Sequence, residues 1–151
     1  MQHFLQPDLD YIRFFSGLAC MLLAVATLWM KRIPNNRLQW KWLWLFGFTH
    51  GLGDWLNMLA YGLGDSNVFF LIRLAMLGIS FLFLLEFGRS ITGSLKISVP
   101  GRWIYLPLSL LALLGGFDGL AGLNASLRYA LGLTGGLWSA WALRKLQLRE
   151  Y

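Results

Sequence analysis

The chain has 151 residues, of which 57% are hydrophobic and 13% are charged, with a formal net charge of +6. A soluble domain carries about a quarter charged residues, so this composition excludes an ordinary water-soluble protein and predicts an all-α integral membrane protein. The basic residues lie in short clusters between long apolar runs, which excludes a nucleic-acid-binding surface.

Five apolar segments approach the length of about 20 residues that a helix needs to span a bilayer. In chain order they cover residues 11–30, 41–62, 67–88, 103–118 and 126–143. Short links, GDSN at 64–67 and GLN at 122–124, predict antiparallel neighbours. We therefore predict a single polytopic domain over residues 1–151, a bundle of about five transmembrane helices.

The distribution of lysine and arginine predicts how this bundle is oriented. Basic residues follow the first, third and fifth segments: Lys31, Arg32, Arg37, Lys41, Arg89, Lys96, Arg102, Arg144, Lys145 and Arg149. With five spans they all lie on one side, which the positive-inside rule makes the cytoplasm. We expect the N-terminus outside, the C-terminus in the cytoplasm, and a multi-pass membrane protein.

The second segment contains three polar side chains within the stretch GFTHGLGDWLNM: His50, Asp54 and Asn57. Their spacings of four and three residues place them on one helix face. A histidine here could bind a ligand, change protonation or simply be hydrogen-bonded within the packing. A bis-histidine haem is disfavoured, because the other histidine, His3, lies outside the predicted spans.

The remaining charged residues of the spans fall in the same predicted outer half. They are Arg13, Arg73, Asp118 and Arg128. A charge at the bilayer centre costs at least about 2.5–3.5 kcal/mol, so such groups tend to face the bundle and pair. We predict that they form a polar cluster with Asp54. Two alternatives stay open: the outermost side chains extend separately to the lipid head groups, or the cluster has only a structural role.

Small residues and one ion pair complete the sites that we expect. Glycines four residues apart let helices approach closely, either within the bundle or against a second copy: Gly47 with Gly51, Gly132 with Gly136, and Gly115 with Gly119. Glu86 and Arg89, three residues apart at the cytoplasmic end of the third segment, are predicted to pair. Cys20 is the one cysteine, which excludes an internal disulfide. One cysteine and two histidines are too few for a zinc site, and we expect no metal or cofactor.

Three stretches resemble the N-terminal multi-helix membrane module of certain bacterial signalling proteins. They are HGLGDWLNM, FLLEFGRS and RYALGLTGGLWSAWALRKL. In those proteins the module precedes PAS, histidine-kinase or GGDEF diguanylate cyclase domains. The matching positions are His50, Gly51, Leu52, Asp54 and Trp55, then 85–89, then Arg128, Tyr129 and Gly132. This chain departs from the family pattern at Asp54, where the modules carry glutamate, and at Thr134, where they carry proline.

The resemblance implies a sensory input domain that relays a stimulus through its last helix, with His50 and Asp54 as the most sensitive positions. It implies a place in the bacterial inner membrane, with a second copy and a cytoplasmic kinase or cyclase domain as partners. Composition and the placement of the basic residues already predict the lipid bilayer as a partner and no nucleic acid. The chain would then be either a piece of a longer receptor or a small stand-alone relative. No nucleophile–base pair or phosphate loop is visible in the sequence, so we expect no enzymatic activity. Two alternatives stay open: an accessory subunit of a membrane complex, and a small-solute or proton transporter.

Overall fold

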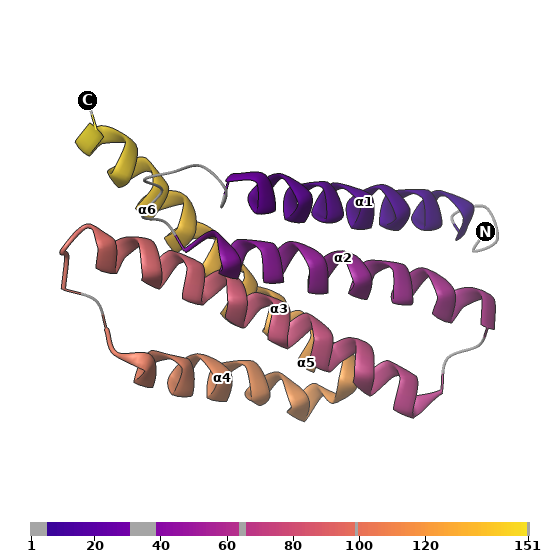
Figure 1. Ribbon diagram of the computed structural model, residues 1–151. Coiled ribbons are helices and arrows are strands. Elements are labelled where there is room, and N and C mark those ends of the chain that lie inside the picture. Colours follow the sequence, from indigo (N-terminus) through magenta and orange to yellow (C-terminus); the bar gives the residue numbers. More distant parts are fainter. Residues whose placement is uncertain (1–5, 31–38, 64–65, 99, 151) are drawn as a thin grey trace.

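The fold is known from a computed structural model, which describes residues 6–30, 39–63, 66–98 and 100–150 (Figure 1). Within these ranges the chain forms helices and short turns, without a strand. The α-helices are α1 (Gln6–Met30), α2 (Trp40–Leu63), α3 (Asn67–Ser94), α4 (Tyr105–Leu114), α5 (Gly119–Leu127) and α6 (Thr134–Glu150). Short 3₁₀ turns, η2 (Arg102–Ile104) and η3 (Gly115–Asp118), flank α4, and a π-helical turn, η4 (Arg128–Leu133), joins α5 to α6. The predicted all-α class is confirmed.

The helices form antiparallel rods in which α5, η4 and α6 follow one another as a single long helix (Figure 1). The first helix, α1, packs on α2, α2 on α3, and α3 on α6, while α4 packs on α5 and η4. Three stretches are long and apolar enough to cross a membrane: Tyr11–Met30, Asn67–Ser94 and Arg102–Leu148. A membrane protein is therefore supported by the length and composition of these helices.

The chain reverses between α4 and α5 at a glycine turn. Gly119 has φ of 77°, a left-handed conformation that glycine adopts without strain. Beyond it the two arms touch, because a Cβ at Gly115 would lie 2.5 Å from the Cβ of Ser126. The predicted link at 122–124 is wrong, since these residues are helical and the turn comes earlier. Gly115 and Gly119 consequently do not form one helix face.

The third helix continues six residues beyond its predicted end at 88 and stops at Ser94. The prediction ended the helix before the charge of Arg89, but this charge is paired within the helix. Hydroxyl groups also bond back to the helix, with Thr92 donating to the carbonyl of Gly88. Lys96, with φ of 57°, takes the left-handed conformation that follows the helix. The first helix likewise begins earlier than predicted, at Gln6.

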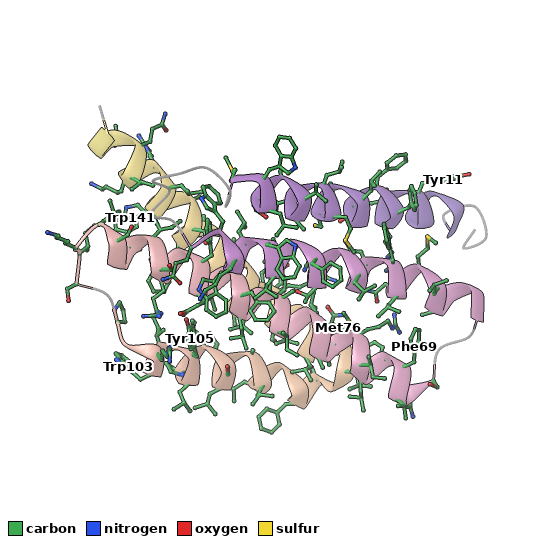
Figure 2. All side chains as sticks on the ribbon, in the orientation of Figure 1. Tyr11, Phe69, Met76, Trp103, Tyr105 and Trp141 are labelled. Carbon is green, nitrogen blue, oxygen red and sulfur yellow. The ribbon has the colours of Figure 1, made fainter. Side chains whose placement is uncertain are left out.

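The core is centred on α3, which contributes to two buried clusters. One lies in the middle of the bundle and consists of Phe81, Leu85, Ala112, Ala130 and Leu131. The other lies where α3 ends and consists of Phe87, Ile91, Leu95 and Ala142. Large apolar side chains also point outward, among them Tyr11 of α1 and Trp103 beside α4 (Figure 2). Such an apolar exterior is what a lipid-facing surface requires.

Glycines set the distance between α1 and α2. A Cβ at Gly47 would lie 2.7 Å from the carbonyl oxygen of Cys20, and one at Gly51 would lie 2.8 Å from that of Gly17. The predicted close approach at Gly47 and Gly51 is confirmed, and Gly17 is a third participant that the sequence did not reveal. Of the other predicted pair, Gly132 packs on the ring of Phe81, whereas Gly136 has no atom near its Cβ position.

Candidate functional site

The two ends of the bundle carry different charges. At one end, which we call the basic end, lie Lys41, Arg89, Lys96, Arg102, Arg144 and Lys145. At the other, α3 begins and α2 ends, and we call it the Arg73 end. Phe69 and Trp103 mark the Arg73 end and the basic end, respectively, in Figure 2. The antiparallel rods therefore gather the charged residues of different helices into two layers.

Arg73 is the buried cation of the Arg73 end, with 8% of its surface exposed. Its Nη1 donates to Oδ1 of Asn57 at 2.6 Å, which joins α3 to α2. The guanidinium carbon also lies 5.3 Å from the ring centroid of Phe69 and 5.4 Å from that of Phe70. A hydrogen bond to a charged group contributes about 1.5–3 kcal/mol and a cation–π contact about 0.5–2 kcal/mol. Together these contacts offset the cost of placing the charge at this depth.

Asn57 is held in the orientation that Arg73 needs. Its Nδ2 donates to the carbonyl oxygen of Gly53, one helical turn earlier, at 2.9 Å. The amide group has one oxygen and one nitrogen, so this bond leaves Oδ1 directed at Arg73. A glycine at position 53 leaves the space beside that carbonyl open, because no atom lies within 4 Å of its Cβ position.

Asp54 binds a neutral partner on the first helix. Its Oδ2 accepts a hydrogen bond from Ser16 Oγ at 2.6 Å. Among the described residues, neither Arg73 nor Arg128 forms a salt bridge with this carboxylate. Asp54 and Asn57 share a helix face in sequence, but in the fold they connect α2 to two different neighbours, α1 and α3.

Arg128 closes a small internal cavity beside Arg73. The cavity measures about 10 Å³ and its polar lining comes from Asn57, Arg73, Asn124 and Arg128. This volume is close to the space that one water molecule needs. Arg128 Nε donates to Asn124 Oδ1, four residues earlier, at 2.8 Å. The cavity therefore brings together polar side chains of α2, α3, α5 and η4.

The structure divides the predicted polar cluster into separate groups. Asn57, Arg73 and Arg128 border the cavity, and Asp54 bonds to α1. Asp118 lies in the η3 turn beside Gly122, exposed on the outside of the hairpin. Arg13 is half-buried on α1 and is not part of the cavity lining.

His50 is held in the packing between α2 and α3. Its Nδ1 lies 3.0 Å from Ser80 Oγ, and the same hydroxyl donates to the carbonyl of Leu77 at 2.7 Å. Because a hydroxyl has one proton, this assigns a donating N–H to Nδ1 of the ring. The ring centroid lies 5.2 Å from those of Phe46 and Phe81. Of the interpretations left open by the sequence, these contacts favour a packed, hydrogen-bonded histidine.

Glu86 forms the centre of the polar contacts at the basic end. Arg89 binds its carboxylate with two donors, Nε to Oε2 at 2.7 Å and Nη2 to Oε1 at 2.5 Å. The predicted pair is therefore confirmed. The hydroxyl of Tyr105 also donates to Oε2, from a side chain that lies between α4 and α3 in Figure 2. One carboxylate thus neutralises Arg89 and fastens the start of α4 to the end of α3.

Further bonds at the same end join α6 to α3. Trp138 Nε1 donates to Thr92 Oγ1 at 2.9 Å, and Ser139 Oγ donates to the carbonyl of Leu84 at 3.0 Å. Gly88 allows this approach, because a Cβ there would lie 3.0 Å from Ser139 Oγ. The last helix is therefore fixed to α3 by side-chain hydrogen bonds that lie between the π-helical turn and the basic end.

No family model matches this chain, and no curated protein or solved structure matches it. The resemblance to bacterial sensory modules stays a prediction. In the part of the chain that the structure describes, no three His, Cys, Asp or Glu side chains lie together as a metal-binding group. The function has to be argued from the geometry of the polar residues themselves.

Neutral side chains are the part of this site that sequence reasoning missed. Ser16, Ser80, Asn124 and Tyr105 each bond to a residue that had been singled out. Asn124 could have been found from the sequence, because it lies four residues before Arg128 on one helix. The other three bond across helices, and a serine or tyrosine in an apolar segment carries no charge that would mark it.

Proposed function

We propose that this chain is a membrane-embedded signal-input domain in which the Arg73 end acts on the last helix. The observation that carries the proposal is the position of Arg128. It borders the polar cavity beside Arg73, and it lies on the same continuous helix as Arg144 and Lys145 at the basic end. A change at the cavity therefore has a direct mechanical route to the opposite end of the bundle.

The π-helical turn η4 is the part of this route that can change. It begins at Arg128 and ends at Leu133, between the cavity and the bonds that fix α6 to α3. The hydrogen bonds of a π-turn span one more residue than those of the α-helix, and such turns are frequent at functional sites. A stimulus that repositions Arg128 would be taken up here as a rotation or shift of α6. It would do so only to the extent that it favours one arrangement over the other.

The orientation that we propose places the basic end in the cytoplasm of a bacterial cell and the Arg73 end in the outer leaflet. Five crossings, with the N-terminus outside, are supported by the antiparallel rods and by the reversal at Gly119, which divides the apolar stretch Arg102–Leu148 into two arms. They are supported also by the gathering of lysine and arginine at one end. The partner that would read the signal is a cytoplasmic domain at the end of α6, with a kinase or cyclase favoured by the resemblance.

Distance measurement between spin labels tests this proposal. Cys20 would be replaced by Ala, and labels placed at two exposed positions of the basic end, Ser94 of α3 and Leu148 of α6. We expect Arg73→Gln to shift the distance distribution by about 1–2 Å, the size of helix movements in known switches. Lys41→Gln, which removes an exposed charge at the basic end, is the matched control and should leave the distribution unchanged.

A milder variant keeps this test decisive if Arg73→Gln does not fold. Asn57→Ala removes one hydrogen-bond acceptor of Arg73 but leaves the charge in place. If both variants insert with wild-type helicity and their label distances equal those of the wild type, the two ends are not coupled, and a signal-input role is excluded.

A second candidate, an accessory subunit of a membrane complex, is favoured by glycines that face no neighbour. Gly116 and Gly136 have no atom within 4 Å of a Cβ position, and the adjoining Phe117 is 90% exposed. Such a surface suits a helix of another protein. Cross-linking from position 117 in native membranes separates the two functions. A single abundant partner of fixed stoichiometry would support the subunit, and cross-links to lipid alone would exclude it.

A further inference from the structure

An open groove runs along the outer surface of the last helix, next to the polar cavity. It has a volume of about 560 Å³, within the range of small-molecule sites. The residues on which the inference depends are Phe81, Arg128, Tyr129, Gly132, Gly136 and Leu137. The groove is apolar along most of its length and has a cation at one end.

Two glycines create the hollow. No atom lies within 4 Å of a Cβ position at Gly136, so any larger side chain there would fill the groove without displacing the bundle. At Gly132 a Cβ would lie 2.8 Å from the ring of Phe81, which is therefore the floor of the groove. Tyr129, 71% exposed, stands beside the charged end.

The dimensions of the groove match one leaflet of a bilayer. Arg128 and Leu137 are nine residues apart, which is about 13 Å along a helix. Half of a hydrocarbon core is about 15 Å. The charged end lies at the Arg73 end of the bundle and the apolar end lies near its middle, the same polarity that a lipid has within one leaflet.

The charge at the head of the groove is complementary to an anion. Arg128 is exposed, and its Nε is bonded to the neutral amide of Asn124. Among the described residues, no carboxylate forms a salt bridge with it. Arg73 lines the small cavity that Arg128 also borders, which adds positive charge behind the head of the groove. A guanidinium group binds phosphate through paired donors.

We propose that this groove binds an anionic phospholipid from the leaflet at the Arg73 end, with its phosphate on Arg128 and an acyl chain along Gly132 and Gly136. The inference deepens the proposed function, because it names the class of ligand that would act as the signal. Only this role as a signal rests on the proposed function. Binding to the groove can be measured without any signalling readout, so the failure of one proposal is distinguishable from the failure of the other.

A second copy of the chain is a less suitable occupant than a lipid. A symmetric pair would use the same patch on both copies, and both chains would cross the membrane in the same direction. Each Arg128 would then lie at the same depth as its equivalent, and like charges repel in a medium that does not screen them. A lipid phosphate supplies the opposite charge at that depth.

Native mass spectrometry of the purified chain tests the proposal. The protein would be released from mixed micelles that hold equal amounts of phosphatidylglycerol, which is anionic, and phosphatidylcholine, which is zwitterionic. Both lipids carry a phosphate, but in phosphatidylcholine the ammonium group of the head offsets its charge. We therefore expect phosphatidylglycerol adducts to exceed phosphatidylcholine adducts about tenfold, the size of effect that a bond to a charged group has. Arg128→Gln should abolish this preference, Arg128→Lys should retain most of it, and Gly136→Leu should reduce the adducts of both lipids.

Two matched controls distinguish the groove from general effects. Arg144→Gln removes an equal charge from the same helix, and Gly116→Leu adds an equal side chain at another open glycine. Both should behave as the wild type. The proposal is overturned if Arg128→Gln and Gly136→Leu, at wild-type helicity, keep the wild-type lipid ratio and adduct number. It is also overturned if Gly136→Leu instead removes a dimer from the same spectra, because the groove would then be a contact between copies.

Discussion

Glu86 at the basic end and the pair Asp54 and Arg128 at the Arg73 end are bonded in opposite ways. At the basic end, Glu86 holds Arg89 with two hydrogen bonds and Tyr105 with a third, so charge cancels charge within the chain. At the Arg73 end, Asp54 bonds to the hydroxyl of Ser16 and Arg128 to the amide of Asn124, and both partners are neutral.

This difference in bonding has a consequence for how each end of the bundle responds to a change in its surroundings. An ion pair that is largely withdrawn from water resists change, because removing either partner leaves a charge in a poor solvent. A charge that is bonded to a neutral group is held in place, but its charge is not neutralised. An ion or a lipid head group of opposite charge is therefore still attracted to it. We therefore expect the basic end to resist perturbation and the Arg73 end to respond to it.

Neutralising one acid at each end gives the largest expected contrast. Glu86→Gln should lower the free energy of unfolding by about 2–3 kcal/mol, somewhat below the cost of breaking a fully buried pair because Arg89 is half-buried, and the new amide opposes two donors. Asp54→Asn should cost about 0.5 kcal/mol or less, because its amide oxygen still accepts from Ser16 as an ordinary neutral hydrogen bond. Unfolding in mixed micelles of increasing denaturing detergent measures both. Equal losses would remove the contrast between the two ends.

The next largest effect concerns the close packing of α1 on α2, which places Ser16 beside Asp54. Gly47→Ala should destabilise the bundle by about 2 kcal/mol, because its Cβ would lie 2.7 Å from the Cys20 carbonyl oxygen and overpacking costs about 1–3 kcal/mol. Gly53→Ala on the same helix meets no atom within 4 Å and is the control. Equal stability of the two variants, in the same detergent titration, would show that α1 is not closely seated.

A smaller effect is expected at the polar cavity. Asn57→Ala removes one acceptor of the buried Arg73 and should cost about 1.5 kcal/mol, the lower value for a bond to a charged group. Asn124→Ala removes the acceptor of the exposed Arg128, whose donors water or a head group can satisfy, and should cost less. If the order is reversed in thermal unfolding of the reconstituted protein, Arg73 does not depend on α2.

The smallest effect is expected at His50. Ser80→Ala removes its hydrogen-bond partner and should cost about 1 kcal/mol, the usual value for a neutral bond. It should also change the ring-nitrogen chemical shifts of His50 in a nitrogen-labelled sample. Ser94→Ala, whose hydroxyl bonds only within its own helix end, is the control. Unchanged His50 shifts in Ser80→Ala would contradict the assignment of the donating proton to Nδ1.

Several features of the fold were predictable because they depend on local sequence. Apolar length places most of the helices, and the three-residue spacing of Glu86 and Arg89 is enough to predict their pair. The spacing of Gly47 and Gly51 likewise predicts a close neighbour, although not which one. The chain reversal was misplaced, because GGFDGLAGLN offers several glycines and only the packed hairpin selects Gly119 for the left-handed conformation.

By itself, the sequence determined that this protein is helical, that its helices suit a bilayer, and that charged side chains recur near the same depth of successive helices. Each of these follows from composition and from a constant rise per residue. Only the tertiary structure decided the partners. Asp54 was predicted to cluster with arginines of three other helices, yet it bonds to Ser16, and Arg73 bonds to Asn57. The physical reason is that sequence fixes how far along its helix a side chain lies. Its partner depends instead on which face of each neighbouring helix is turned toward it. Which faces meet is set by the way α1, α3 and the last helix pack around α2 and the small cavity.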